Sequence, residues 1–422
     1  MANNLTSNTQ ATLSKKILDR FESMRTISKT VNTQFLSDAI NSNTGDTVFI
    51  KRPGRFKSTA TPDGDISGTT ANSIIAGKAQ GTVQDFITVE VDWSILEEAT
   101  QLNQLDELVI EPMCDEIVAT LETRFGQFAM KNSNLSVGTP GNAVDAWGDV
   151  AKAGALTKSL SFPSGDVNCL INPFSQVALS EIQRSIGTAD ALVNPAFKDA
   201  VIDSNFAGMR VMTSDSLATF TSGASADRVG AIVGTPTATY IAAKDTMTQS
   251  ITIGGLTANG DVKAGEVIEV TGRHYLNQST RQVILDGASA VKWRATVTAD
   301  ATISAGGEVT VIVAGPAIKE STEQYDTVDS ALTAGDVVTL LNATATLYQP
   351  NMFYHKNAYA IGSVPLPKLS AQDVLMKTKD GLQLRCSRGS SLRENKQIMR
   401  IDLLPAFAVL NPFLAGQVFG NV

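Results

Sequence analysis

Histidine and cysteine are scarce in this chain of 422 residues. It has two histidines, His274 and His355, and three cysteines, Cys114, Cys169 and Cys386. Most general-base, metal-ligand and triad chemistry depends on histidine, so we expect both histidines to be surface or hydrogen-bonded structural residues. Three cysteines far apart in sequence cannot supply a disulfide framework or a paired-cysteine metal site. A reducing cytoplasm is therefore the simplest compartment for this chain.

Long apolar runs and the common catalytic motifs are also missing. No run of eighteen apolar residues occurs, which excludes a membrane-spanning helix. The sequence has no phosphate-binding loop, dinucleotide fingerprint, zinc-protease motif, serine elbow or calcium-loop spacing. The acidic pairs Glu97/Glu98 and Asp115/Glu116 would diverge on a helix, and Cys114 is expected to be a packed thiol. The sequence therefore predicts no enzyme activity, no cofactor, no metal site and no membrane contact.

Positive charge is in short supply and unevenly distributed. The chain has 34 basic and 42 acidic residues, a net charge of −8, so sequence-independent binding of nucleic acid is not its main role. Residues 79–123 contain eleven acidic residues and no basic one. A loop just before them contains Lys51, Arg52, Arg55 and Lys57 without an acid. The acidic run is too one-sided for internal pairing, so we expect it to meet a basic surface.

The N-terminal part has helical spacing. Apolar residues at Ile17, Phe21 and similar positions predict an amphipathic helix over 11–31. Its other face carries basic residues, namely Lys15, Lys16, Arg20, Arg25 and Lys29. Three interpretations stay open: a membrane-surface helix, an arm that binds a partner, or a plain surface helix.

An extended loop is predicted next. The strand-like pieces 47–50 and 86–93 are separated by about thirty residues rich in Gly, Ser, Thr and Pro. Loops of this length within a compact domain are uncommon and are usually functional or flexible. Helical spacing returns over 94–131, where Pro112 should kink the helix or begin a second one.

The remainder alternates between mixed and all-β character. The stretch 145–222 contains a strand that ends at 172, a helix over 174–186 and a strand in 206–217. Residues 223–347 are poor in aromatics and contain repeated short Val, Ile and Thr strands, which predicts a separate β-sandwich or barrel. Residues 348–422 return to mixed character with strand-like runs.

Three phrases and the order of these parts resemble a known family. The phrases are FAGMRVMTSDSL (206–217), VKAGEVIEVTGRHYLNQSTRQV (262–283) and NMFYHKNAYAIGSVPLP (351–367). Together they resemble the major capsid proteins of tailed double-stranded DNA phages, and most nearly the coat proteins of short-tailed Salmonella and Shigella phages. The resemblance implies an α+β fold of the Hong Kong 97 type with an inserted Ig-like or telokin-like all-β domain.

The resemblance also implies a role for each part. The expected parts are an N-terminal arm with its amphipathic helix (1–45), an extended loop between two strands (46–92), a peripheral domain with a long spine helix (93–150), the first part of an axial domain (151–222), the inserted β domain (223–347), and closing strands of the axial and peripheral domains (348–422). Within the last part, residues 348–400 are expected to join 151–222 in the axial domain.

The implied function is assembly of an icosahedral shell around the phage DNA. Implied partners are other copies of the chain in hexamers and pentamers, a scaffolding protein, a portal protein, and DNA bound without sequence specificity. The implied location is the virion, after assembly in the host bacterial cytoplasm. Some family members crosslink lysine to asparagine between subunits, but no acidic catalytic partner can be assigned here, so we expect no crosslink. An acidic lining suits packaging, because strong DNA binding would stall it.

The resemblance suggests which residues meet other chains. The loop bases Lys51, Arg52, Arg55 and Lys57 are candidates to pair with Glu97, Glu98, Asp106 and Glu107 of a neighbouring subunit. Pairing within one subunit is equally open. If the contact is between subunits, reversal of Arg52 and Arg55 should leave the melt of the lone chain unchanged. Candidate scaffold contacts are Lys15, Lys16, Arg20 and Arg25.

Two other classes of function stay open from sequence alone. The first is a β-rich receptor-binding or tail-fibre-type adhesion protein with residues 223–347 as its ligand module, which would be a stable monomer or trimer with a saccharide ligand. The second is a hydrolase, which would need two carboxylates about 5–9.5 Å apart in a pocket.

Overall fold

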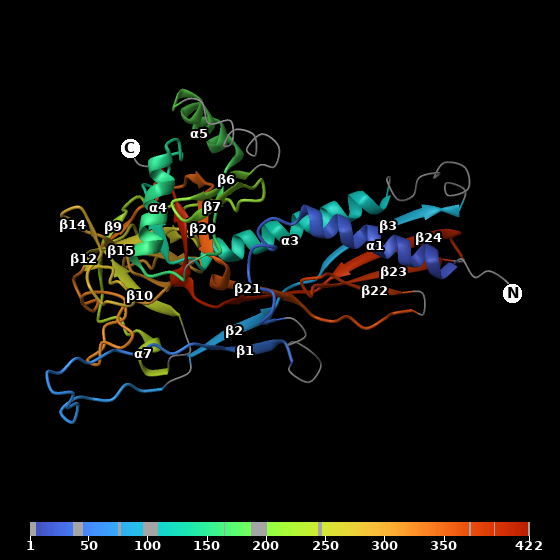
Figure 1. Cartoon of the computed structure of the whole chain (residues 1–422). Helices are drawn as coiled ribbons and strands as arrows, with labels where there is room; N and C mark the ends of the chain where they lie inside the picture. The colour runs from blue at the N-terminus through green and yellow to red at the C-terminus, as the bar shows by residue number, and fades with distance from the viewer. Residues whose placement is uncertain are drawn as a thin grey trace. The chain divides into compact units, whose positions relative to one another are not determined.

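The structure is a computed structural model that describes residues 6–36, 45–74, 77–95, 109–163, 165–186, 201–243, 247–370, 373–391 and 393–420. The elements belong to two compact units, each built from separate stretches of the chain (Figure 1). The first unit comprises residues 1–50, 80–126 and 359–408. The second comprises residues 51–79, 127–358 and 409–422.

The first unit combines helices with two four-stranded sheets. Its elements are α1 (Thr6–Met24), β1 (Thr47–Arg52), β2 (Gly77–Val83), β3 (Ile87–Ser94), the start of α3 (Glu111–Lys131), β21 (Tyr359–Ser363), β22 (Val374–Lys377), β23 (Gln383–Ser391), β24 (Lys396–Leu403) and β25 (Pro405–Val409). One sheet has the order β1-β2-β25-β21 and the other has the order β22-β23-β24-β3. In Figure 1 the second sheet is the long ribbon in which β3 lies beside β24.

The strands within residues 348–400 are distributed between the two units differently from the expectation. Residues 348–400 were expected to join 151–222, but β22, β23 and β24 pair with one another and with β3 in the first unit. The register runs from Ile87↔Leu403 to Ser94↔Lys396. The chain therefore closes this sheet by pairing strands some three hundred residues apart, a contact that sequence order does not reveal.

Strand β2 lies inside the segment 46–92, which the sequence predicts to be one loop between two strands. Its buried positions are Gly77, Ala79 and Gly81, so the inward face of this strand has almost no side chain. A Cβ at Gly81 would lie 2.7 Å from Leu36 Cδ2, so any other residue there would have to displace the Leu36 side chain. The predicted loop is therefore shorter, because small inward residues conceal a strand from an apolar pattern.

Helix α1 ends at Met24, although the apolar spacing predicts a helix over 11–31. The Glu122 carboxylate on α3 holds the turn that follows, because it accepts the backbone N–H groups of Ile27 at 2.6 Å and Ser28 at 3.2 Å. The Ser28 hydroxyl also donates to this carboxylate. Glu122 thus binds N–H groups that a continued helix would have used internally.

Helix α3 has Glu111 and Pro112 in its first turn. Residues 109 and 110 before it are already helical and 96–108 lie outside the described residues, so whether Pro112 kinks a helix or begins one stays a prediction. Within the first unit, Phe125 of α3 is fully buried. Its ring meets Tyr359 and Phe407 edge-on, with centroids 6.3 and 5.1 Å apart. Aromatic pairs of this geometry add to the free energy gained from burial.

The contact between Glu122 and residues 27–28 makes a stability prediction. Glu122→Gln would place an amide nitrogen against N–H donors, so we expect the free energy of unfolding at pH 7 to fall by about 1–3 kcal/mol. Burial raises the pKa of Glu122 above its ordinary value of 4.5, so ionisation costs stability as the pH rises through that raised pKa. The native chain should therefore gain stability relative to the glutamine variant on acidification toward pH 4.5.

Denaturant melts at both pH values measure these differences. Glu116→Gln is the matched control, because Glu116 lies on the same helix with its side chain exposed. Equal stability of the native chain and Glu122→Gln at pH 7 would contradict the anchoring role.

The second unit contains a six-stranded mixed sheet of order β4-β26-β20-β5-β7-β6. Its elements are β4 (Leu135–Val137), α4 (Trp147–Ser159), β5 (Val167–Ile171), α5 (Pro173–Ile186), β6 (Val201–Phe206), β7 (Met209–Thr213), β20 (Asn351–His355), η2 (Lys356–Ala358), η3 (Pro412–Leu414) and β26 (Ala415–Val418). The pairs β5/β7 and β4/β26 are parallel. The predicted strand ending near 172, the helix over 174–186 and the strand near 209 are confirmed as β5, α5 and β7.

A closed six-stranded barrel of order β10-β17-β15-β12-β18-β9 is the other main part of this unit. Its strands are β9 (Val229–Ile232), β10 (Thr248–Gly254), β12 (Val267–His274), β15 (Lys292–Val297), β17 (Val309–Ala314) and β18 (Val337–Leu340). Smaller elements around it are α7 (Thr239–Ala243), β11 (Asp261–Val262), β13 (Leu285–Asp286), β14 (Ser289–Ala290) and β16 (Ala301–Thr302). The strands lie within 223–347, where the sequence predicts a β-barrel or sandwich. Ile251, Trp293 and Val297 are fully buried inside it.

The chain enters and leaves the barrel at neighbouring positions, because β8 (Phe220–Thr221) pairs with β19 (Leu347–Tyr348). The buried Glu266 carboxylate accepts the backbone N–H of Gly223 at 2.7 Å and Nη1 of Arg228 at 2.8 Å. Arg228 also donates through Nη2 to the carbonyl oxygens of Gly223 at 2.6 Å and Ala343 at 3.1 Å. The Glu266–Arg228 ion pair thus holds together the segments through which the chain enters and leaves the barrel.

The closed barrel leads to a prediction about residues 223–347. As an isolated fragment they should melt cooperatively and give a β-type circular dichroism spectrum, because the barrel has its own interior and no open strand edge. Trp293 is the only tryptophan of the fragment, so its emission should be blue-shifted until the melt. Ile251→Asp, which buries an unpaired charge, should abolish both signals. A disordered spectrum from the parent fragment would contradict an independent fold.

Candidate assembly surfaces

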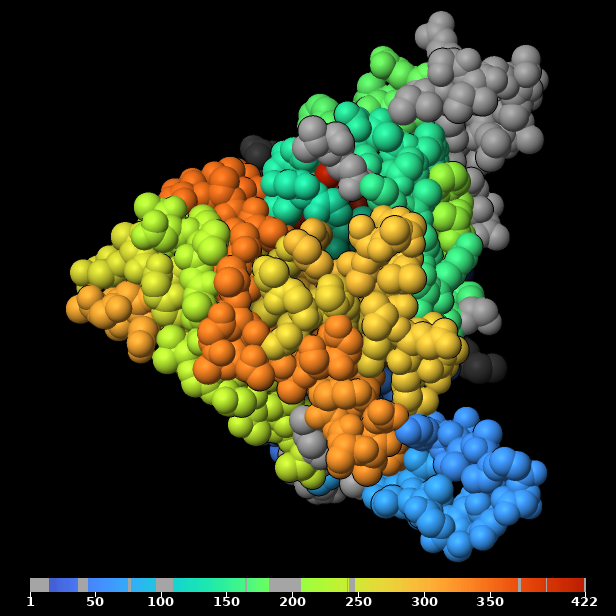
Figure 2. All heavy atoms as spheres, turned by 90° about the vertical axis from the view of Figure 1, so that its left-hand side faces the viewer, coloured from blue at the N-terminus to red at the C-terminus, as the bar shows by residue number. Residues whose placement is uncertain are grey.

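The extended loop is the first candidate surface for contact with other chains. No helix or strand occurs between Pro53 and Ile74, and most of these residues are exposed. Phe56, Ile66 and Ile74 are 57%, 60% and 90% exposed. The loop forms the blue mass at the lower right of Figure 2. An extended segment with uncovered apolar side chains gains burial only when another chain covers it.

Three of the four loop bases, Arg52, Arg55 and Lys57, form polar contacts within the second unit. Arg52 donates through Nε to the carbonyl oxygen of Leu410 at 2.6 Å. Lys57 pairs with Glu323 of the barrel at 2.5 Å, and this pairing lowers the pKa of Glu323. Lys51 is exposed. The loop bases therefore bind within the second unit, to residues that sequence reasoning did not pair with them.

Arg55 is half-buried against the barrel. Its guanidinium donates to the side-chain oxygen of Gln278, and its backbone N–H donates to the Tyr325 hydroxyl at 3.4 Å. Burial, reinforced by the neighbouring Arg281 cation, lowers the pKa of Arg55. The charge of this side chain is thus held against the barrel of its own chain.

The acidic residues expected to receive these bases lie outside the described part of the chain. They are Glu97, Glu98, Asp106 and Glu107. Their pairing with loop bases of a neighbour stays a prediction. The test by charge reversal changes, however, because a glutamate at position 55 would stand beside Arg281 and acquire a new partner there.

Truncation of Arg55 gives a cleaner prediction. Arg55→Ala should lower the free energy of unfolding of the lone chain by about 0.5–2 kcal/mol, because packing and a hydrogen bond are lost. Lys51→Ala should leave it unchanged, since the Lys51 side chain is exposed. Chemical denaturation of scaffold-free protein measures both. An unchanged Arg55→Ala variant would contradict the contact with the barrel, and would return Arg55 to the set of residues available to a neighbour.

Helix α1 is the second candidate surface, and the four predicted scaffold contacts differ in accessibility. Lys15 and Lys16 are exposed on the helix. Arg20 is partly exposed but paired, and the Arg25 side chain is fully buried and pairs with Asp380 at 2.5 Å. The prediction for Arg25 is wrong, because a buried guanidinium presents no surface to a partner. The residue was assigned by helical spacing, but α1 has already ended before it.

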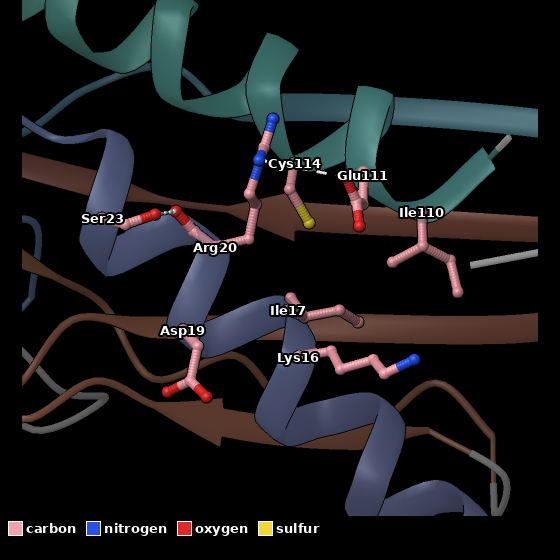
Figure 3. Close-up of a pocket in the computed structure, with 8 residues that line it drawn as sticks. All are labelled: Lys16, Ile17, Asp19, Arg20, Ser23, Ile110, Glu111 and Cys114. Atoms are coloured by element: carbon pink, nitrogen blue, oxygen red, sulfur yellow. Dashed lines mark hydrogen bonds and ion pairs between the residues drawn. The ribbon is translucent and has the colours of Figure 1, made fainter. Parts of the chain in front are cut away.

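The contact between α1 and α3 is a bidentate ion pair. Arg20 donates through Nε and Nη2 to the two carboxylate oxygens of Asp115, both at 2.7 Å. This pairing lowers the pKa of Asp115. Beside it Ile17 and Phe21, each 1% exposed, bury the apolar face of the helix. Figure 3 shows Arg20 reaching from α1 toward α3. The basic face of α1 is thus partly used inside the unit.

A hollow of about 350 Å³ separates the two helices next to this ion pair. Its lining comprises Lys16, Ile17, Asp19, Arg20, Ser23, Ile110, Glu111 and Cys114 (Figure 3). Burial raises the pKa of the Cys114 thiol to about 12, so the thiol stays protonated at neutral pH. This confirms the prediction of a packed thiol.

Described members of the acidic run 79–123 meet basic residues of the same unit. Asp92 pairs with Lys396 of β24 at 2.8 Å, and Asp115 pairs with Arg20 of α1. The bases come from the N-terminal arm and the closing strands, which sequence order places far away. The expectation of a basic partner surface is therefore met in part within the chain itself.

A third candidate surface, which the sequence analysis missed, surrounds the start of α5. Phe174 and Val177 are 85% and 59% exposed, and nearby Leu347 is 69% exposed. Phe174 and Leu347 border a hollow of about 310 Å³. Leu179 of α5 faces inward and Phe174 faces outward. Neighbouring exposed apolar residues of this kind are typical of protein contacts.

The two histidines have the structural roles expected from sequence. His274 Nδ1 lies 2.7 Å from Asp329 Oδ2, and this contact lowers the pKa of Asp329. His355 is buried and accepts the backbone N–H of Asn357 at 3.0 Å. Within the described ranges, no group of three or more His, Cys, Asp or Glu side chains is placed to hold a metal ion. No described helix is long and apolar enough to cross a membrane.

Comparison with known proteins finds phage coat and capsid proteins that are similar to this chain. Residues 1–420 match the family model described as P22 coat protein, gene protein 5. A "Major capsid protein" of Acyrthosiphon pisum secondary endosymbiont phage 1 is 39% identical over 426 residues, covering 100% of both chains. A solved structure titled Mycobacterium phage Che8 has 10% identity and a TM-score of 0.46 over 93% of this chain and 90% of its own. The capsid of Ralstonia phage GP4 has 9% identity and a TM-score of 0.45 over 95% and 91%.

Proposed function

The chain belongs to the P22 coat protein family, so we propose that it builds the phage shell as hexamers and pentamers around double-stranded DNA, with a separate scaffolding protein. It is a major capsid protein and a component of the virion, as predicted from sequence. The α+β phage-capsid fold predicted with it is confirmed. The alternative of an adhesion protein is set aside, because the family match covers residues 1–420.

The extended loop is the observation that supports assembly through arms and loops. Phe56, Ile66 and Ile74 are exposed in the single chain and would be covered by a neighbouring copy. Two copies each carry a net charge of −8, so contacts between them need apolar or oppositely charged surfaces. The loop and the apolar residues around α5 both meet this need.

The partner contacts follow from charge and exposure. Lys51 is the exposed loop base best placed to reach Glu97, Glu98, Asp106 or Glu107 of a neighbour. Each such pair contributes only ~0–1 kcal/mol, but the contact repeats at every subunit boundary. The acidic chain would line the shell without holding DNA strongly. We place assembly in the host cytoplasm, with a portal protein at one vertex.

The scaffolding protein is proposed to bind helix α1. Lys15 and Lys16 are exposed there, whereas Arg20 is only partly exposed and the Arg25 side chain is buried. An exposed basic pair on an amphipathic helix suits a partner with an acidic surface. This assignment replaces the original set of four contacts by two.

Co-expression with the phage's scaffolding protein tests the proposal. Negative-stain microscopy should show closed shells for the native chain. The double variant Lys15→Glu/Lys16→Glu should melt like the native chain but reduce scaffold incorporation by about tenfold, since two attractive contacts become repulsive. Lys29→Glu, an exposed reversal beyond the end of α1, is the control.

The possible outcomes separate two claims. If only small oligomers form from the native chain under every assembly condition, shell formation with this scaffold fails. If shells form and the double variant incorporates scaffold normally, the assignment of α1 as the scaffold surface is wrong.

A further inference from the structure

Two segments of the barrel grip the extended loop of the same chain. We call residues 277–281 and 320–326 the cradle. Both belong to the second unit with the loop, and Figure 2 shows orange barrel atoms directly against the blue loop. The loop has two limbs, which leave the cradle near Arg55 and return near Ser73. The cradle bonds both limbs, a contact between segments more than two hundred residues apart that the sequence analysis did not predict.

Gln324 is the residue that joins the limbs. Its Nε2 donates to the carbonyl oxygen of Arg55 at 2.5 Å and to that of Ser73 at 2.9 Å. Its Oε1 accepts the backbone N–H of Ser73 at 3.3 Å. Gln324 is only 4% exposed, so its amide is committed to these partners. A buried amide with matched donors and acceptors fixes one geometry, because any displacement leaves a polar group unpaired.

Further contacts reinforce the grip on the outgoing limb. Arg281 donates through Nη2 to the carbonyl oxygen of Phe56 at 3.1 Å and through Nε to that of Glu323 at 2.7 Å. Lys57 pairs with Glu323. Asn72 on the returning limb receives the backbone N–H of Lys57 at 3.0 Å and donates to its carbonyl oxygen at 2.7 Å. The limbs are therefore bonded to the cradle and to each other.

The cradle contains two residues with a strained backbone, and both contact the loop. Arg281 and Glu323 both have positive φ, at 60° and 53°, a conformation that costs free energy for residues other than glycine. Each side chain bonds the loop, and Arg281 Nε also donates to the backbone carbonyl oxygen of Glu323. Strained positions persist when surrounding contacts hold them, and here those contacts come from both the cradle and the loop.

We propose that the inserted barrel is the positioning element of the extended loop. The cradle holds the base of the loop before assembly and thereby directs its outer part, residues 58–71, toward a second copy of the chain. Preorganisation of this kind raises the rate and free energy of association, because less conformational entropy remains to be lost on contact. This inference rests on the proposed assembly function.

Hydrogen exchange of the lone chain tests the grip. The backbone N–H groups of Arg55, Lys57 and Ser73 are all bonded at the base of the loop. Gln324→Glu replaces the donor by an oxygen that faces two carbonyls, so exchange at these three amides should become about tenfold faster. The Val297 amide of β15, bonded to the carbonyl of Glu266 at 2.8 Å, should stay protected and report an intact barrel.

Gln282→Glu is the matched control, since it makes the same chemical change at an exposed side chain next to the cradle. Exchange at the base of the loop should not change in this variant. If Gln324→Glu disturbs the barrel, Ser73→Pro removes the N–H bonded to Gln324 from the loop side and should loosen Arg55 and Lys57 alone. Unchanged exchange in Gln324→Glu, or in Ser73→Pro where that variant is needed, would contradict the claim that the cradle holds the base of the loop.

Shell assembly with scaffold completes the test. Native and Gln282→Glu chains should assemble at equal rates, and the loosened variant about tenfold more slowly. Loosened exchange with a normal assembly rate would overturn the positioning role. Failure of the native chain to assemble would contradict the proposed function, while the exchange results would still decide the grip.

Discussion

The extended loop must find partners for its own backbone, and much of the second unit can be understood from this constraint. A segment without helix or strand has N–H and C=O groups that no ladder satisfies. Side chains of the barrel satisfy several of them, with the Gln324 amide serving both limbs. The apolar residues of the loop, such as Ile74, remain exposed in the single chain. The structure thus separates two tasks: backbone groups are paired internally, and apolar side chains are left for another copy.

Charge is organised on the same principle of long-range pairing. The acidic run 79–123 looks uncompensated in sequence, but the first unit joins it to residues 359–408, which have eight basic and four acidic residues. Pairs such as Asp92–Lys396 bring the two together. Buried carboxylates have a separate role, because Glu122 and Glu266 bind backbone N–H groups where the chain changes direction. A carboxylate suits these positions because it accepts several hydrogen bonds at once.

The helices and strands that depend on the local spacing of apolar residues were predicted from the sequence. Strands with alternating or continuous apolar residues, such as β5 and the barrel strands, were found from sequence, as was α5. Strand β2 was not predicted because its inward residues are glycine and alanine, which contribute little to an apolar pattern. The end of α1 at Met24 was not predicted because Glu122, almost a hundred residues away, binds the backbone of the turn that follows it. The candidate contacts were predicted least well, since the partners of Arg55 and Lys57 lie more than two hundred residues beyond them.

The adjoining ends of the barrel segment have an evolutionary consequence. Ser222 donates its backbone N–H to the Thr346 carbonyl at 3.0 Å, and Ala345 donates to Gly223 at 3.1 Å, so the two ends already lie side by side. A host fold could acquire or lose such a module with little rearrangement of its own sheet, because no gap separates the ends. Loss of the barrel would have a further effect because of the cradle. A lineage that lost the barrel would also lose the contacts that hold its extended loop. The module is therefore easy to insert and hard to remove.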